Sequence, residues 1–221
     1  MKLDRREELK AKKQAYVQDE ILASAVTLFA ARGFRAVTID DIASNLGYTK
    51  SVVYYYFRSK SEILWQVFSR NYDTYFESIT AISQAELEPI DALARIIRAH
   101  AINVMERHEW TAIYHRDESE LTEKQKKLIL GRKREYDAAI ERVYQAGVDT
   151  GAIRDDIPTA VAVRAILGCC NWLYTWYKQD GPLSPQAIAD HYVSLLMEGY
   201  ALPSKLQKAA RSKPSAKTAN A

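Results

Sequence analysis

Glycine and proline are scarce in this chain, with 8 and 6 copies among 221 residues. Because these residues end helices and form turns, their scarcity favours long helices, and 48% hydrophobic residues are enough for a packed core. Only two cysteines occur, Cys169 and Cys170, and they are adjacent. Neighbouring cysteines do not make a disulfide framework, so we expect buried thiols in a reducing compartment. These absences predict an all-α protein.

Long apolar runs and a signal-peptide core are also lacking, so we expect a cytoplasmic protein without a membrane span. Four histidines are present, but they lie far apart and lack the spacing of metal ligands: His100, His108, His115 and His191. The chain has no glycine-rich phosphate loop and no G-x-S-x-G nucleophile motif. We therefore expect no metal, no cofactor and no enzyme.

Charge is distributed unevenly along the chain, although the net charge is only +3. Residues 1–70 carry 12 Lys and Arg against 8 Asp and Glu, whereas residues 71–202 carry 14 against 20. Residues 203–221 carry five basic residues and no acidic one. Basic ends suit a polyanion such as a nucleic acid, and the acidic middle suits another task.

Helical spacing of apolar residues and the positions of Gly, Pro and capping residues predict about nine helices. A clear helix begins at Asp19 and ends at Gly33, and later boundaries fall at Pro89, Thr122, Pro158 and Ser184. The segment from Pro158 to about Tyr177 is expected to be one helix. The chain therefore divides into four parts. Residues 1–18 are a flexible basic arm, and residues 19–65 are a three-helix domain. Residues 66–202 are a larger helical domain that a long connecting helix opens, and residues 203–221 are a disordered basic tail.

The stretch TIDDIASNLGYTKSVVYYYF predicts a helix-turn-helix over residues 37–56. Thr38 and Asp41 have the spacing of a capping box, Gly47 makes the turn, and Thr49 and Ser59 are placed to cap the next helices. At about 100° per residue, one face of the second helix holds the apolar residues Val52, Val53, Tyr56 and Phe57. The other face holds Lys50, Ser51, Tyr54 and Tyr55.

Two tyrosines beside a lysine and a serine suit DNA, because hydroxyls and ammonium groups bind phosphates while ring edges contact sugars and thymine methyls. The alternative is that these tyrosines pack against another helix. Free N–H groups at the helix starts behind Thr38 and Ser59 add two phosphate-binding ends, and Lys60 lies beside the second.

The run from Ile21 to Leu64 resembles the DNA-binding domain of the TetR family of bacterial regulators, in its AVTLFAARGF, TIDDIA, LG-Y-TKS and VYYYFRSKSEIL segments. The resemblance implies a homodimer that binds a palindromic operator and releases it on binding a small-molecule effector. It also implies DNA contacts from Thr38, Thr49, Lys50, Ser51, Tyr54, Tyr55 and Lys60.

The last two predicted helices are the most apolar, and a two-fold dimer can form from two helices per subunit. One face of the last helix is therefore predicted to dimerise: Ile188, Tyr192, Leu195, Leu196 and Tyr200. The alternative is an ordinary monomer core. Amphipathic residues predict a ligand pocket: Trp110, Tyr114, Arg116, Asn171, Trp172, Tyr174 and Trp176. Core or dimer packing is the alternative for each of these residues.

The C-terminal half is similar to TetR-family regulators of fatty-acid, steroid or aromatic-acid catabolism, which implies an apolar effector such as an acyl-CoA thioester. The leading hypothesis is thus an operator-binding repressor that such an effector releases. Two others stay open: a DNA-binding regulator without an effector, and a helical enzyme or sequestering protein.

Overall fold

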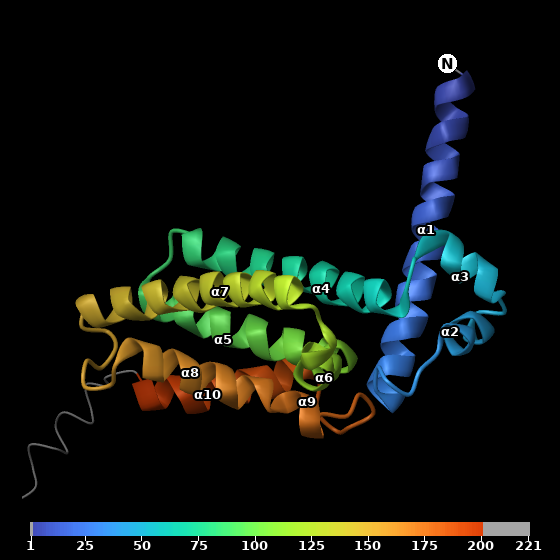
Figure 1. The fold of residues 1–221 in the computed structure, drawn as a ribbon. Helices are drawn as coiled ribbons and strands as arrows, with labels where there is room; N and C mark the ends of the chain where they lie inside the picture. Colours follow the sequence, from blue (N-terminus) through green and yellow to red (C-terminus); the bar gives the residue numbers. More distant parts are fainter. Residues whose placement is uncertain (1, 201–221) are drawn as a thin grey trace, which may run out of the picture.

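The computed structural model describes the backbone of residues 2–200 and the side chains of residues 5–70 and 76–200. Over this range the chain forms ten α-helices, one short 3-10 helix and no strand, which confirms the all-α prediction. Figure 1 shows two parts: an upright first helix with two short helices beside it, and a long helical bundle. The predicted tail, residues 203–221, lies outside the described residues.

The first part consists of α1 (Lys2–Arg32), α2 (Ile39–Asn45) and α3 (Lys50–Tyr56). The α1 helix begins at Lys2, well before the predicted start at Asp19, so the expected flexible arm is its first turns. Lys, Arg, Glu, Leu and Ala dominate these turns and favour helix, and a Glu8–Lys12 ion pair of 2.7 Å supports it. Gly33 ends α1 with φ of 85°, a conformation that glycine adopts readily.

The bundle begins with the long connecting helix α4 (Lys60–Gln84), which runs from the first part along one side of the second. It continues with α5 (Pro89–Glu106), α6 (His108–Asp117), a 3-10 turn (Glu118–Glu120) and α7 (Glu123–Asp149). The last helices are α8 (Thr159–Asn171), α9 (Leu173–Trp176) and α10 (Pro185–Tyr200). None of the described helices has the length and hydrophobicity that a membrane-spanning segment requires.

The segment predicted as one helix from Pro158 to about Tyr177 is two helices, because the chain turns at Trp172. The turn places Leu173 in the core, fully buried where α9 packs against α5 and α6. Tertiary packing thus prevails over an apolar pattern that is continuous in the sequence. Residues 2–200 correspondingly form ten α-helices, where about nine were expected.

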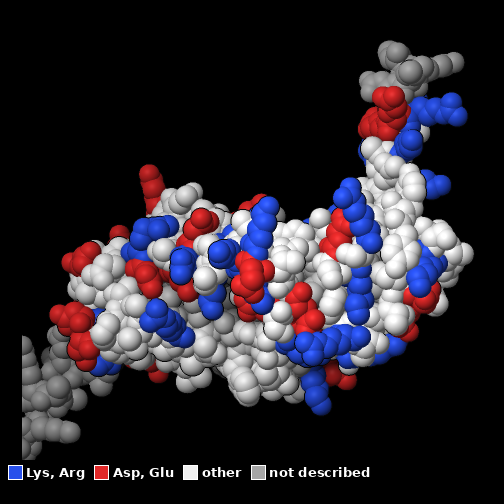
Figure 2. All heavy atoms as spheres, in the orientation of Figure 1, with Lys and Arg blue, Asp and Glu red and all other residues white. Residues whose placement is uncertain are grey.

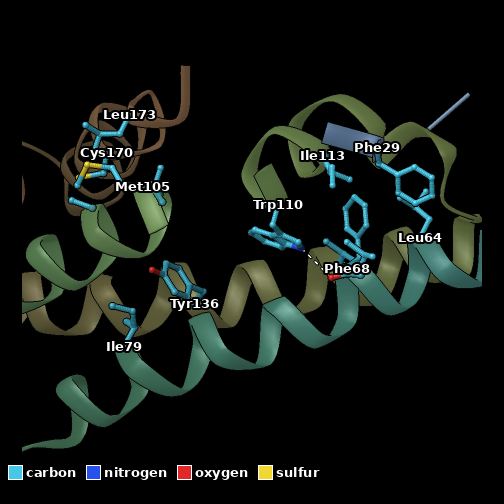
Figure 3. Packing of buried hydrophobic residues seen from close by; sticks show 14 of the residues in the cluster. Phe29, Leu64, Phe68, Ile79, Met105, Trp110, Ile113, Tyr136, Cys170 and Leu173 are labelled. Atoms are coloured by element: carbon cyan, nitrogen blue, oxygen red, sulfur yellow. Dashed lines mark hydrogen bonds between the residues drawn. The ribbon is translucent and has the colours of Figure 1, made fainter. Parts of the chain in front are cut away.

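One continuous core joins both parts of the molecule. Figure 3 shows Phe29 of α1, Leu64 and Phe68 of α4, and Ile113 of α6 packed together where the parts meet. The Trp110 indole N–H donates to the Val67 carbonyl at 3.1 Å, which ties α6 to α4. The DNA-proximal helix α1 therefore packs against both α4 and α6.

Candidate nucleic-acid interface and ligand cavity

Helices α2 and α3 form the predicted helix-turn-helix. Thr38 and Asp41 make the predicted capping box, with Thr38 Oγ1 accepting from the Asp41 N–H at 3.1 Å. Hydrogen bonds from Thr38 to the Asp41 carboxylate lower the pKa of Asp41. Ser59 caps α4 as predicted, whereas Thr49 precedes α3 without a side-chain cap bond. Gly47, with φ of 68°, makes the turn.

The α3 helix has the two faces that its sequence predicts. Val53 and Phe57 are buried in the core, and Val52 and Tyr56 are half-buried. The opposite face is exposed and holds Lys50, Ser51, Tyr54 and Tyr55. Tyr54 and Tyr55 keep 47% and 69% of their surface accessible, so the described residues do not cover them as core packing would. Exposed aromatic and cationic groups on one face of a short helix can bind a nucleic acid.

Polar contacts with α1 fix the position of α3. The Tyr48 hydroxyl donates to Glu20 Oε2 at 2.7 Å, and the Gln14 amide lies 3.5 Å from the Tyr55 hydroxyl. Lys50 Nζ forms a 2.9 Å ion pair with Asp40 of α2, and its hydrogen bond with Asp40 raises the pKa of Lys50. Both partners are exposed, so a phosphate can replace Asp40 at little cost.

Lys60 lies differently from the other predicted DNA contacts. Its ammonium group donates to the carbonyl oxygens of Phe34 and Val37 at 2.7 and 2.6 Å, and it lies over the Phe34 ring. These bonds hold the turn between α1 and α2. Lys60 therefore has a structural task, and we leave it out of the proposed DNA contacts.

A cavity of about 100 Å³ lies in the bundle beside α6. Trp110 of α6 and Tyr136 of α7 border it, and both side chains are labelled in Figure 3. The other lining residues come from α5, α6, α7 and α8: His100, Val104, Thr111, Tyr114, His115, Lys133, Asp137, Leu167 and Asn171. Apolar walls with a few converging polar groups are typical of a ligand site.

The polar side of this cavity is organised by His100, which is buried. His100 Nε2 lies 3.0 Å from Asn171 Oδ1 and Nδ1 lies 2.6 Å from the Tyr136 hydroxyl. An amide oxygen only accepts hydrogen bonds, so Nε2 of His100 donates to Asn171. Nδ1 then accepts from the Tyr136 hydroxyl, and the imidazole ring of His100 is neutral. Burial lowers the pKa of His100 to about 4.

Three of the predicted ligand residues line the cavity: Trp110, Tyr114 and Asn171. Trp172 and Trp176 are 64% and 47% exposed on the outside of the bundle. Tyr174 lies beside the cavity, stacked on His115 with ring centroids 5.1 Å apart. Arg116 points away from the cavity and binds α1. The prediction missed His100 and Tyr136. One signal in the sequence marked His100: it is a titratable residue at a core position of α5. Its neighbours on that face are apolar, namely Leu93, Ile96, Ile97, Ala101 and Val104.

The surface predicted for dimerisation is partly internal. Ile188 and Tyr200 are only 6% and 8% exposed, because α10 packs against α5 and the Tyr200 hydroxyl donates to the Ala162 carbonyl. Leu195 is 71% exposed, and a groove beside it is lined by Gly168, Cys169, Trp172, Tyr192, Leu195 and Leu196. Cys169 is therefore exposed, contrary to expectation, whereas Cys170 is buried and its pKa rises to about 12 by desolvation.

The buried imidazole predicts that stability falls in mild acid. The folded state keeps His100 neutral to about pH 4, whereas the unfolded chain takes up a proton near pH 6.5. The contribution is thus complete above pH 6.5 and declines as the pH falls toward 4. We expect a loss of about 2 kcal/mol of unfolding free energy between pH 7 and pH 5 from this group. Urea unfolding at both pH values measures it.

His100→Gln removes the titrating group and should reduce this pH dependence by the same amount, whatever its effect on stability at pH 7. His191→Gln, at an exposed site on α10, is the matched control and should leave the pH dependence unchanged. An equal pH dependence in wild type and His100→Gln would show that His100 does not carry the effect.

Comparison with known proteins adds two family models and several relatives. Residues 21–67 match the model of bacterial regulatory proteins of the tetR family, and residues 86–200 match that of the tetracyclin repressor-like C-terminal domain. The HTH-type transcriptional repressor KstR2 of Mycolicibacterium smegmatis is 28% identical over 183 residues, which cover 82% of this chain and 89% of that protein.

Two solved structures share the fold over most of this chain. The ketosteroid transcriptional regulator KstR2 of Mycobacterium tuberculosis superposes with a TM-score of 0.80 at 25% identity and covers 84% of this chain and 95% of its own. AibR in complex with isovaleryl coenzyme A and operator DNA has a TM-score of 0.73 at 25% identity, with 81% and 97% covered. The chain belongs to the TetR family of transcriptional regulators.

Proposed function

We propose that this protein is a homodimeric repressor that leaves its operator when a small, largely apolar molecule binds in the cavity beside α6. One observation carries the proposal: a single ten-residue helix borders the cavity and also holds the DNA-binding part. Trp110 and Tyr114 of α6 line the cavity, while Arg116 donates to the carbonyl oxygens of Phe29 and Ala30 at the end of α1.

The proposed division is residues 19–65 for DNA reading and residues 66–202 for ligand binding and dimerisation. The α3 helix enters the major groove of each half-site, as the second helix of such a unit does. The proposed contacts are the six exposed candidates: Thr38, Thr49, Lys50, Ser51, Tyr54 and Tyr55. The KstR2 relatives are named as repressors, which supports repression as the sign of the effect.

Cavity size limits what the ligand can be. A volume of about 100 Å³ is below the ~150 Å³ of an apolar cavity that binds benzene, so it suits a group of a few carbon atoms. Val104, Leu167 and Trp110 supply apolar walls, and the charged groups of Lys133 and Asp137 lie on the border. We propose a short-chain acyl-CoA, its acyl group inside and the rest of the thioester passing out along α7. The AibR neighbour, solved with isovaleryl coenzyme A, supports this class.

Such a ligand also explains release. The acyl group together with the thioester carbon and sulfur that follow it needs more room than the cavity offers, so ligand binding favours a form in which α6 lies farther from α7. Arg116 then moves with α6, and its hydrogen bonds to the Phe29 and Ala30 carbonyls transmit this movement through α1 to α3. A ligand shifts the equilibrium only by its difference in affinity for the two forms, and here that difference comes from the extra room.

Isovaleryl-CoA should weaken the binding of the protein to an operator duplex obtained by in vitro selection. In Arg116→Gln the same thioester should still bind, but its effect on DNA affinity should be about tenfold smaller, since allosteric coupling is typically 1–3 kcal/mol. Fluorescence anisotropy of labelled duplex with and without saturating thioester measures the effect, and calorimetry measures thioester binding.

Free coenzyme A is the ligand control, and Arg98→Gln is the protein control because it breaks an exposed ion pair with Asp190, on α5 and α10. Neither should change the coupling. If neither isovaleryl-CoA nor longer thioesters alter DNA affinity, the protein is a regulator without this effector class. If Arg116→Gln responds as wild type does, the coupling between ligand and DNA binding does not pass through the hydrogen bonds from Arg116 to α1.

A further inference from the structure

The first turns of α1, as far as Lys13, project beyond the helix-turn-helix. The family model for the DNA-binding domain begins at residue 21, so this segment is additional to the matched domain. Figure 1 shows it extending past α3, away from the side of the bundle where α8 and α10 lie. Its described side chains from Arg5 to Lys13 are all exposed or nearly so.

The segment is continuous with the reading face. Gln14 contacts Tyr55 of α3 across 3.5 Å, so α1 passes directly beside the exposed side of the recognition helix. Lys10 lies one helical turn before Gln14, and Lys13 is its neighbour in the chain. Whatever α3 binds in this direction therefore lies next to these lysines.

Charge on this segment is largely separated by face, although Lys12 at the edge of the basic half pairs with Glu8 at 2.7 Å. At about 100° per residue, one half of the helix circumference carries all its basic side chains, and Glu7 and Glu8 lie on the other half. The basic half consists of Arg5, Arg6, Lys10, Lys12 and Lys13. Figure 2 shows the blue side chains of this segment mainly on its right, where α3 lies in Figure 1, and the red ones on its left.

Two apolar groups lie within the basic half, Leu9 and Tyr16, with 61% and 63% of their surface exposed. Leu9 lies one helical turn from basic residues on both sides, whereas Tyr16 follows Lys12 and Lys13 and hydrogen-bonds Glu20. Apolar and aromatic groups among cations fit the sugar-phosphate edge of a duplex, where cations bind phosphates and apolar atoms contact sugars.

We propose that the basic half of α1 from Arg5 to Tyr16 is a second DNA contact, on the duplex outside the sequence that α3 reads. This inference rests on the proposed operator binding. If α8 and α10 form the dimer face, the two-fold axis lies on that side, and this segment of each subunit points to the outer end of the operator. Twelve helical residues span about 18 Å, which corresponds to about five base pairs of flanking duplex.

The test compares two variants on two duplexes. Lys10→Gln with Lys13→Gln removes two charges from the proposed contact, and Arg134→Gln with Arg142→Gln removes two from exposed sites on α7, in the bundle. The long duplex carries the selected operator with about ten extra base pairs at each end, and the short duplex ends at the operator. Circular dichroism confirms that both variants keep the helical content of wild type.

On the long duplex, Lys10→Gln with Lys13→Gln should bind at least tenfold more weakly than wild type. The slope of log affinity against log salt should fall by about two per subunit, since each lost phosphate contact removes about 0.9. On the short duplex, this variant should bind as wild type does, and the α7 control should bind as wild type does on both. Equal loss on both duplexes, or no loss on the long one, overturns the inference. Failure of wild type to select any duplex overturns the proposed operator binding instead.

Discussion

Replacing Lys50 and Tyr54 together by alanine should weaken operator binding by at least about a hundredfold while leaving the fold intact. Each side chain is exposed on α3, so its loss removes no core contact. A hydrogen bond to a charged group is worth about 1.5–3 kcal/mol, and the dimer loses the Lys50 contact twice. Anisotropy titrations of the selected duplex measure the loss, and thermal unfolding shows whether the variant folds.

Two further variants make the result specific. Lys50→Arg with Tyr54→Phe retains the charge and the ring, so it should keep much of the affinity. Lys127→Ala removes one charge from an exposed site on α7 and should leave binding within about threefold of wild type. An affinity of the alanine pair within threefold of wild type would mean that α3 does not read DNA.

Leu195→Glu should convert the proposed dimer to a monomer. Leu195 is exposed beside an apolar groove between α8 and α10. Val161 on α8 and Trp172 just after its end add exposed apolar surface. A symmetric interface receives the new carboxylate twice, near the two-fold axis, and each unpaired buried charge costs several kcal/mol. We expect the dimer dissociation constant to rise at least about a thousandfold, equivalent to about 4 kcal/mol. Sedimentation velocity over a concentration series measures it.

Leu128→Glu is the matched control, because Leu128 is also an exposed leucine but lies on α7. That variant should sediment as wild type does. Leu195→Glu should also lose most of its affinity for a two-half-site duplex, because a monomer binds only one half-site. A Leu195→Glu protein that stays dimeric would place the interface elsewhere on the bundle.

Local signals in the sequence predicted much of the fold. Three of these signals involve only one or two residues and act locally: the capping box at Thr38, the serine before α4 and the proline that opens α5. The two faces of α3 followed from helical spacing alone. Contacts between distant segments were not visible in this way. Leu173 lies in the core because α9 packs against α5 and α6. The residues next to Leu173 in the chain give no sign of this packing.

The candidate cavity shows the same limit. Trp110, Tyr114 and Asn171 were predicted because amphipathic side chains often line pockets, but the same rule also selected Trp172 and Trp176, which are exposed. A helical pattern shows which residues share a face and not which face meets which neighbour. Arg116 was expected at the ligand pocket, whereas the structure shows it bonded to carbonyl groups 86 and 87 residues earlier in the chain, a contact that no helical pattern reveals.

The unbroken length of α1 has a mechanical consequence. Thirty-one residues at 1.5 Å each make a rod of about 46 Å, gripped near one end by Arg116. Rotation by about 5° at the grip displaces the far end by about 4 Å, a third of the ~12 Å width of a major groove. A rotation of α1 about the end held by Arg116 would move its first turns the most, so in the proposed mechanism effector binding should alter contacts at the flanks of the operator more than at its centre.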